Sequence, residues 1–407
     1  MEYKPLNSIT EEIRLITILQ TSQDAHDHAS DSQNQEDLIH CTLEHYSLVQ
    51  GDWLSIDYSR ECTAPFLDWA TEDCQESLVD MAHTTSERNC VRAEGVGVLE
   101  FRFNWGDFVA LSYAWGEPDQ KKEIVVNGKR TIVQANLEAA LRVLQNKRPM
   151  KSGCRVWADA LCINQEDIKE RDFEVKRMRL IYKLALDVVI WLGPEADDSS
   201  RAMDLIHTLS NSCKSGTDKS LGIALRRNSE LLGRGIWLAL SFLLDRPYWH
   251  RMWIIQELSM GGGKAPILCG HKTVIWEDFF RAIYTFGIHN IDVLFTCINL
   301  ERKAVGLREW GLNRNKIIHI NDEHRKQAGL GNPQFMCLLD LARKSEATDQ
   351  RDKVYGILGL MEPAVSTQIN PNYSLPVDEV YISFAQKYIY GSRWTHWQNK
   401  RITLMVF

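Results

Sequence analysis

The sequence predicts an α/β protein with a mostly parallel sheet flanked by helices, a β-rich N-terminal extension and a helical C-terminal region. Three apolar runs, at 108–115, 156–163 and 187–192, have the length and composition of strands that are covered on both faces. Segments 167–185 and 199–209 carry apolar residues at helical spacing. Strands and helices that alternate in this way are typical of a doubly wound parallel sheet.

The composition is that of an ordinary globular protein, with 44% hydrophobic and 25% charged residues. The net charge is −7, and no long basic stripe is present to neutralise phosphates, so we expect no nucleic-acid binding. The N-terminus carries charges where a signal peptide would be apolar, and the most apolar window, 235–244, is too short to cross a bilayer. We therefore expect a cytoplasmic protein without a membrane span.

Ten cysteines are scattered singly along the chain without a C-x-x-C pair. This spacing predicts neither a zinc site nor a disulfide scaffold, and it fits a reducing compartment. Cys162 with His250 or His271 would form a nucleophile and a base. However, no local thiol-protease signature accompanies Cys162, and a cysteine in an apolar run is usually core.

The chain divides by pattern into four regions. Residues 1–50 contain two predicted strands, at 10–20 and 38–49. Residues 51–107 are acidic and weakly periodic, and we interpret them as a surface insertion of short helices. The core is expected at 108–285 and a helical region at 286–407.

Within the core, Asn127-Gly128 lies between two β-rich runs and predicts a hairpin. Asn136 is the predicted N-cap of the next helix. The long helical stretch 235–260 should break near Pro247, because the residue before a proline avoids the α region. The sequence further predicts a polar linker at 211–228, a strand pair at 267–276, and helices from Glu277, at 335–342 and at 352–361.

Polar residues at strand ends are the first candidates for function. Asp159 places a carboxylate in the apolar run 156–163, where it either ties down its own loop or faces a ligand. Asn164 follows in a polar turn, and in open α/β sheets ligands bind at the carboxyl ends of strands. Ser112, Tyr113, Trp115 and Gly116 end another strand. Gly116 there serves either a plain turn or a close backbone approach to a ligand.

Glu257 is the candidate acid. Trp253, Gln256 and Glu257 fall on one helix face by their spacing. A carboxylate flanked by apolar and aromatic residues is either the partner of a nearby arginine, Arg246 or Arg251, or an acid tuned for catalysis. Nucleotide-binding and hydrolase signatures such as Walker A, G-x-G-x-x-G and G-x-S-x-G are absent from the sequence.

Four blocks of sequence resemble the fungal heterokaryon incompatibility (HET) domain. They are A-L-S-Y-A-W-G at 110–116, W-A-D-A-L-C-I-N-Q at 157–165, R-M-W-I-I-Q-E at 251–257 and A-T-D-Q-R-D-K-V-Y-G at 347–356. The resemblance runs from about residue 13 to residue 381. The long acidic insertion and residues 394–407 depart from the family pattern, and the latter departure indicates a truncated chain or an altered gene model.

The HET resemblance implies an effector of fungal self/non-self recognition that triggers regulated death of fused, genetically unlike cells. HET domains are in turn similar to TIR domains, which implies a TIR-like, flavodoxin-like core. Trp253, Glu257 and Leu258 match the TIR pattern W-C-x-x-E-L, whose glutamate serves NAD cleavage; isoleucine replaces the cysteine. In this interpretation Glu257 is catalytic, and Ser112, Tyr113, Trp115, Gly116, Asp159, Asn164 and Trp253 shape the nucleotide site.

The resemblance leaves two mechanisms open. In one, the domain self-associates and degrades NAD, which would be its substrate; no resident cofactor or metal is implied. In the other, it is a non-catalytic interaction module, and death depends on a recognition partner protein.

Overall fold

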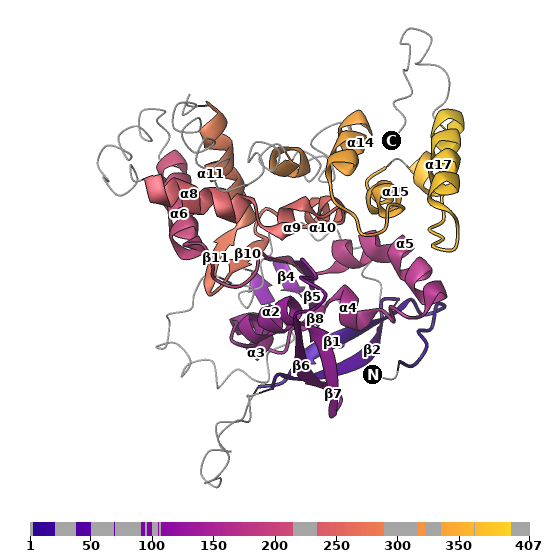
Figure 1. The fold of residues 1–407 in the computed structure, drawn as a ribbon. Helices are drawn as coiled ribbons and strands as arrows, with labels where there is room; N and C mark the ends of the chain where they lie inside the picture. Colours follow the sequence, from indigo (N-terminus) through magenta and orange to yellow (C-terminus); the bar gives the residue numbers. More distant parts are fainter. Residues whose placement is uncertain are drawn as a thin grey trace. The chain divides into compact units, whose positions relative to one another are not determined.

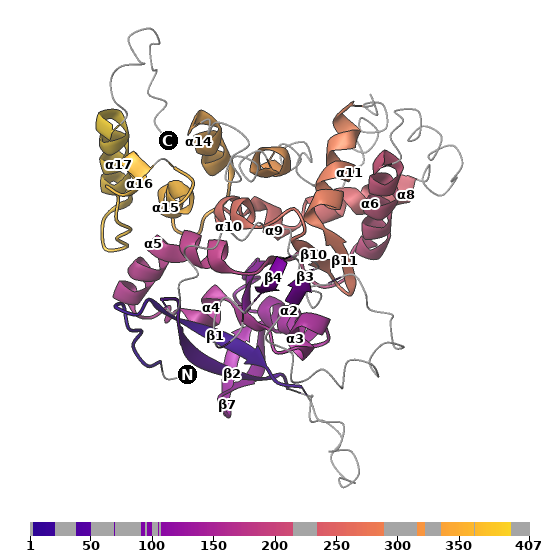
Figure 2. The same ribbon diagram turned by 180° about the vertical axis from the view of Figure 1, so that it is seen from behind.

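The structure is a computed structural model, and it describes the chain in several stretches. These are residues 3–20, 38–49, 69, 91–93, 96–99, 105, 107–214, 234–288, 316–321, 335–361 and 363–391. The contacts divide the chain into two compact units (Figures 1 and 2). The sheet unit comprises Met1–Ile163, Ala185–Pro194 and Pro266–Val274, and the helical unit comprises Asn164–Leu184, Glu195–Ala265 and Ile275–Phe407.

The sheet unit contains a nine-stranded mixed sheet with the strand order β11-β10-β9-β5-β8-β1-β2-β6-β7. The strands in chain order are β1 (Glu12–Ile18), β2 (His40–Ser47), β5 (Phe108–Tyr113), β6 (Lys121–Val126), β7 (Lys129–Gln134), β8 (Arg155–Trp157), β9 (Val188–Trp191), β10 (Pro266–Cys269) and β11 (Lys272–Ile275). The predicted α/β fold class is confirmed.

Four parallel strands form the centre of this sheet. β5 pairs in parallel with β8 on one side and with β9 on the other, and β9 pairs in parallel with β10. In chain order these strands lie 2-1-3-4 across the sheet, which is the order at the start of a flavodoxin-like sheet. All six residues of β5 are buried, as expected for a strand between two neighbours.

The predicted N-terminal strand pair is confirmed and belongs to the same sheet. β1 and β2 are antiparallel, β1 also pairs with β8, and β2 pairs in parallel with β6. The predicted hairpin at Asn127-Gly128 is confirmed as the turn between β6 and β7. Both turn residues have positive φ, 50° and 75°, as a type I′ hairpin turn requires.

Three predictions for the sheet unit were wrong in part. The apolar run 156–163 is not one strand, because β8 ends at Trp157 and a single helical turn, α4 (Asp159–Cys162), follows. Within the predicted helical insertion, the described residues form two antiparallel strands, β3 (Val91–Ala93) and β4 (Val96–Leu99); most of the insertion lies outside the described residues. The N-cap of α2 (Ala135–Gln145) is Gln134, not Asn136.

The helical unit is built from the segments between and after the central strands. Its described residues include the helices α5 (Ile168–Leu184), α6 (Ser199–Lys214), α8 (Arg234–Leu244), α9 (Pro247–His250), α10 (Ile254–Met260), α11 (Trp276–Ile288), α14 (Phe335–Lys344), α15 (Asp352–Leu358), α16 (Pro363–Ser366) and α17 (Val377–Gly391). Residues 316–321 are also helical. The sheet unit contains the short helix α3 (Arg148–Lys151) in addition to α2 and α4.

Two groups of helices pack together inside the helical unit. α6, α8 and α11 lie side by side (Figures 1 and 2), and α10 contacts both α5 and α15. The predicted break near Pro247 is confirmed, since α8 ends before it and α9 begins at it. The predicted linker 211–228 was wrong at its start, because α6 continues to Lys214; residues 215–233 lie outside the described part.

Candidate functional site

A cluster of polar and aromatic side chains lies at the carboxyl end of β5. The indole N–H of Trp115 donates a hydrogen bond to Oδ2 of Asp159 at 2.9 Å. The other carboxylate oxygen, Oδ1, accepts from the backbone N–H of Ala160 at 2.8 Å. Trp115 is 40% exposed, so the residue is partly accessible to solvent. The predicted residues Trp115 and Asp159 are therefore brought into direct contact.

Asn136 joins this cluster from the start of α2. Its side-chain amide donates to the carbonyl of Ala114 at 2.6 Å, and its oxygen accepts from the indole N–H of Trp191 at 2.9 Å. The end of β5, the start of α2 and the end of β9 are thereby linked. The capping rule misassigned Asn136, because these tertiary partners outweigh the local capping interaction.

Gly116 closes the cluster and requires glycine for two reasons. Its φ is +86°, which L side chains rarely adopt, and an added Cβ would lie 3.3 Å from Cβ of Asn136. Ser112 and Tyr113 precede it in β5 and are buried in the sheet, so they support the cluster from within. We call Ala114, Trp115, Gly116, Asn136, Asp159 and Trp191 the strand-end cluster.

The position of the strand-end cluster follows from the strand order. The chain leaves β5, returns on one side as β8 and then returns on the other side as β9. In open α/β sheets the crevice at the carboxyl ends of such strands is where ligands bind. The cluster therefore occupies the edge at which this fold class places a ligand.

The other predicted site residues, Asn164, Trp253 and Glu257, belong to the helical unit. The backbone N–H of Asn164 donates to Oε1 of Glu170 at 2.6 Å, which secures the turn before α5. The indole N–H of Trp253 donates to Oδ2 of Asp352 at 3.1 Å. Each therefore has a structural partner within the helical unit.

Glu257 is 2% exposed and lies on α10, all of whose residues are buried. Its charge acts on a buried lysine, Lys316, and favours the protonated form of that lysine, which raises its pKa. The Lys316 ammonium donates to the carbonyl of Arg251 at 2.7 Å, and only 7% of the residue is exposed. Sequence reasoning proposed arginine partners for Glu257 and missed Lys316, because residues 291–331 carry no clear periodicity.

Comparison with known proteins identifies the domain that contains these residues. The family model "Heterokaryon incompatibility protein (HET)" matches residues 108–257. The match begins at β5 and ends on Glu257 in α10. Residues 108–257 of this chain match the HET domain. The HET domain thus covers the strand-end cluster and Glu257, whereas β1, β2, β10 and β11 lie outside the matched residues.

The chain is also similar to Heterokaryon incompatibility protein 6, OR allele, of Neurospora crassa. It is 27% identical over 314 residues, which cover 66% of this chain and 45% of the relative. The chain therefore spans less than half the length of this curated relative. No solved structure matches the chain significantly.

Burial, followed by the charge of Arg251, lowers the pKa of Lys316 to about 7, although Glu346 and Glu257 oppose the shift. Between about pH 7 and pH 10.5 the folded lysine has lost a proton that the unfolded chain retains. Because the unfolded state binds more protons in this window, the contribution of Lys316 to stability rises with pH.

We expect the free energy of unfolding of the wild type to rise relative to that of Lys316→Met from about pH 7 to pH 10.5. The slope should not exceed about 1.4 kcal/mol per pH unit. Urea denaturation of both proteins across this range measures it. Lys344→Met, which removes a half-exposed lysine of α14, is the control. A difference in the free energy of unfolding between wild type and Lys316→Met that does not change with pH would contradict the lowered pKa of Lys316.

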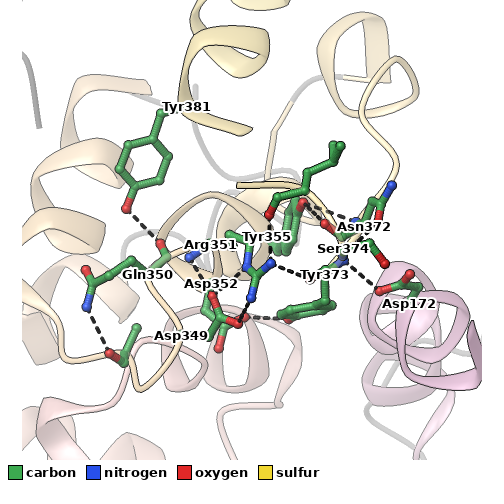
Figure 3. A network of polar contacts seen from close by, with 12 residues as sticks. Asp172, Asp349, Gln350, Arg351, Asp352, Tyr355, Asn372, Tyr373, Ser374 and Tyr381 are labelled. Atoms are coloured by element: carbon green, nitrogen blue, oxygen red, sulfur yellow. Dashed lines mark hydrogen bonds and ion pairs between the residues drawn. The ribbon is translucent and has the colours of Figure 1, made fainter. Parts of the chain in front are cut away.

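A second polar network connects the HET domain to residues beyond its match (Figure 3). Arg351 makes a bidentate contact with Asp349, from Nε to Oδ1 at 2.8 Å and from Nη2 to Oδ2 at 2.7 Å. Its third nitrogen, Nη1, donates to the carbonyls of Tyr373 and Leu375. Arg351 thereby holds the segment 373–375 against the start of α15.

Tyr373 occupies the centre of this network. Its hydroxyl donates to Asp352, and its backbone N–H donates to Oδ1 of Asp172 on α5 at 3.0 Å. The guanidinium of Arg171 lies 4.3 Å from the ring centre, a cation–π contact. Burial raises the pKa of Asp352, although hydrogen bonds from Tyr373 and Trp253 partly offset it. The chain Trp253–Asp352–Tyr373 thus ties three distant segments together.

The remaining candidate, Cys162, is a buried residue of α4 whose sulfur accepts from the backbone N–H of Ala158 at 3.4 Å. Among the described residues, no group of three or more His, Cys, Asp or Glu side chains is arranged to bind a metal ion. None of the described helices combines the length and apolar character needed to cross a bilayer.

Proposed function

We propose that this chain is an effector of fungal self/non-self recognition that acts in the cytoplasm and triggers regulated death of fused, genetically unlike cells. The HET domain and the name of its Neurospora relative support a role in incompatibility. For the mechanism we propose that the HET domain binds NAD at the strand-end cluster and cleaves it, after self-association.

The observation that carries the nucleotide proposal is the strand-end cluster itself. It combines a partly exposed indole and a carboxylate with a glycine that allows the turn to pack closely against Asn136, at the carboxyl ends of β5 and β8. An aromatic face suits a nucleobase, because stacking on aromatic side chains stabilises bound bases. Asp159 holds the indole by its N–H, so the ring is oriented before a ligand arrives.

The chemistry of the proposal assigns bond breaking to Glu257. The bond between ribose and nicotinamide breaks, nicotinamide leaves with the bonding electron pair, and water supplies the hydroxyl of the ADP-ribose product and releases a proton. The transition state resembles an oxocarbenium ion, which an ionised carboxylate stabilises electrostatically.

The burial of Glu257 favours a second candidate function. A carboxylate that is 2% exposed and acts electrostatically on a buried lysine has the surroundings of a structural charge pair. In this alternative the HET domain is a non-catalytic interaction module, and cell death depends on a recognition partner protein.

Nicotinamide release from NAD by the purified chain at high concentration separates the two candidates. We expect Glu257→Gln to lower the rate by about 10²-fold. Trp115→Ala should raise KM for NAD. Glu277→Gln, at a 57% exposed carboxylate of α11, is the control and should retain the wild-type rate.

Killing of fungal cells on expression of the same variants provides the second measurement. Killing that persists in Glu257→Gln, together with no nicotinamide release by folded and self-associated wild type, would reject the enzymatic mechanism and support the interaction module. NAD cleavage would be supported if Glu257→Gln loses both killing and nicotinamide release while wild type and Glu277→Gln retain both.

A further inference from the structure

The one-turn helix α4 carries Asp159 at its start and is held at its end by residues from the N-terminus. The Tyr3 hydroxyl donates to the carbonyl of Leu161 at 3.2 Å. The Arg14 guanidinium donates through Nη1 to the carbonyl of Cys162 at 3.0 Å. A helical turn leaves its last carbonyls without intrahelical donors, and these two side chains supply them.

Arg14 is placed to make this contact and is not free to point elsewhere. It lies in β1 and is 1% exposed, which is rare for an arginine unless its nitrogens are hydrogen-bonded. Its other terminal nitrogen, Nη2, donates to the carbonyl of Lys4 at 2.7 Å, and the Tyr3 ring lies 4.8 Å from the guanidinium carbon. Arg14 and Tyr3 thus also hold each other.

We propose that Arg14 and Tyr3 are positioning residues that fix α4 so that Asp159 meets the indole of Trp115. Both lie before the residues that the HET model matches, so the working unit of the site begins near the N-terminus. The effect on ligand binding rests on the proposed nucleotide function, whereas the effect on the Trp115–Asp159 contact does not.

Because α4 is only one turn long, a displacement at its last residue also displaces Asp159 at its first residue. Only Ala160 and Leu161 separate Asp159 from Cys162, so a movement of the last carbonyl moves the whole turn. The Trp115–Asp159 hydrogen bond is 2.9 Å long, and a hydrogen bond is lost when its atoms separate beyond about 3.5 Å. A displacement of well under 1 Å at α4 is therefore enough to release the indole.

The Trp115 indole N–H reports this contact directly in the full chain, with or without ligand. In nitrogen-15 spectra of the indole groups, Trp115→Phe identifies the signal. We expect Arg14→Met and Tyr3→Phe to shift it and to speed its exchange with water by about ten-fold, since one hydrogen bond is released. Arg14→Lys, whose ammonium serves one carbonyl instead of two, should lie between wild type and Arg14→Met.

His45→Gln is the matched control, because His45 lies opposite Arg14 in the β1–β2 ladder and contacts Glu12. It should leave the Trp115 signal unchanged. Titration with NAD then measures the consequence for binding, and we expect about ten-fold weaker affinity in Arg14→Met and Tyr3→Phe.

The outcomes separate this proposal from the proposed function. A Trp115 signal that stays unchanged in folded Tyr3→Phe and Arg14→Met would overturn the positioning role. A changed signal in a protein whose wild type does not bind NAD would reject the nucleotide function and retain the positioning role. A changed signal with unchanged NAD affinity would show that Arg14 and Tyr3 do not serve the ligand site.

Discussion

Gly359→Ala is expected to lower the free energy of unfolding by about 3 kcal/mol, because it overpacks the contact between α10 and the end of α15. An added Cβ would lie 2.3 Å from Oε1 of Gln256 and 2.8 Å from Cβ of Arg179. Cβ of Arg179 is fixed to the backbone of α5 and cannot rotate away. Gln256 is also confined, because it is buried and its Oε1 accepts from the backbone N–H of Gly359.

Two other glycines provide graded controls for this prediction, which denaturation in urea measures. Gly263→Ala meets nothing within 4 Å and should change stability by less than about 0.5 kcal/mol. Gly356→Ala meets Cγ and Cε of Met252 at 3.2 and 3.3 Å and should fall between the two, because a methionine side chain can repack. A Gly359→Ala protein as stable as Gly263→Ala would refute the close approach of α10, α5 and α15.

Arg351→Met should cost about 3 kcal/mol, because it removes several charge-assisted hydrogen bonds at once. The substitution keeps an apolar side chain of similar length but leaves Asp349 and the carbonyls of Tyr373 and Leu375 without their donor. Arg351 is 20% exposed, so solvent can replace its hydrogen bonds only in part. Segment 373–375 should then show faster amide hydrogen exchange, and hydrogen exchange together with urea denaturation measures both effects.

Arg343→Met is the matched control, since Arg343 pairs with Asp340 on the surface of α14 and is 61% exposed. An exposed pair of this kind contributes at most about 1 kcal/mol. If Arg351→Met and Arg343→Met lower the free energy of unfolding equally, Arg351 does not stabilise the protein more than an exposed surface pair does.

Acid provides a second readout of the Arg351–Asp349 pair. Burial opposes ionisation of Asp349, but hydrogen bonds and charge from Arg351 outweigh burial and hold its pKa below 3.8. A lowered carboxyl pKa contributes stability above its unfolded value, and that contribution is lost as the pH falls through the folded value. Arg351→Met should therefore flatten the acid dependence of stability below about pH 4.

The local signals in the sequence predicted the sheet well. Asn127-Gly128 predicted its hairpin because both residues tolerate positive φ, and this requirement is independent of the rest of the fold. The apolar run 156–163 was misread as one strand, because periodicity cannot distinguish a buried strand from a buried helical turn. Asn136 was misread as a cap because its partners, Ala114 and Trp191, are distant in sequence.

The residues of the candidate site likewise differ in whether a local sequence pattern predicts them. Trp115 and Gly116 were recognised because they lie at the end of an apolar run, and Asp159 because its carboxylate interrupts another such run. The structure brings Trp115 and Asp159 into contact. Glu257 was singled out by helical spacing and by the W-x-x-x-E-L resemblance, and its role stays a prediction. Lys316 and Arg14 left no signal, because a buried cation is defined by its tertiary partners, which no local pattern contains.

The strand order also has a consequence for synthesis on the ribosome. β1 pairs with β2 soon after both emerge, but its other neighbour is β8, and the Arg14 contact lies 148 residues further along the chain. At about 5–20 residues per second, synthesis of these residues takes roughly 7 to 30 s, and one edge of β1 stays unpaired during this time. β9 then waits for β10 in the same way. Nascent chains with open strand edges are prone to associate, so this protein should depend on chaperones while it is being made.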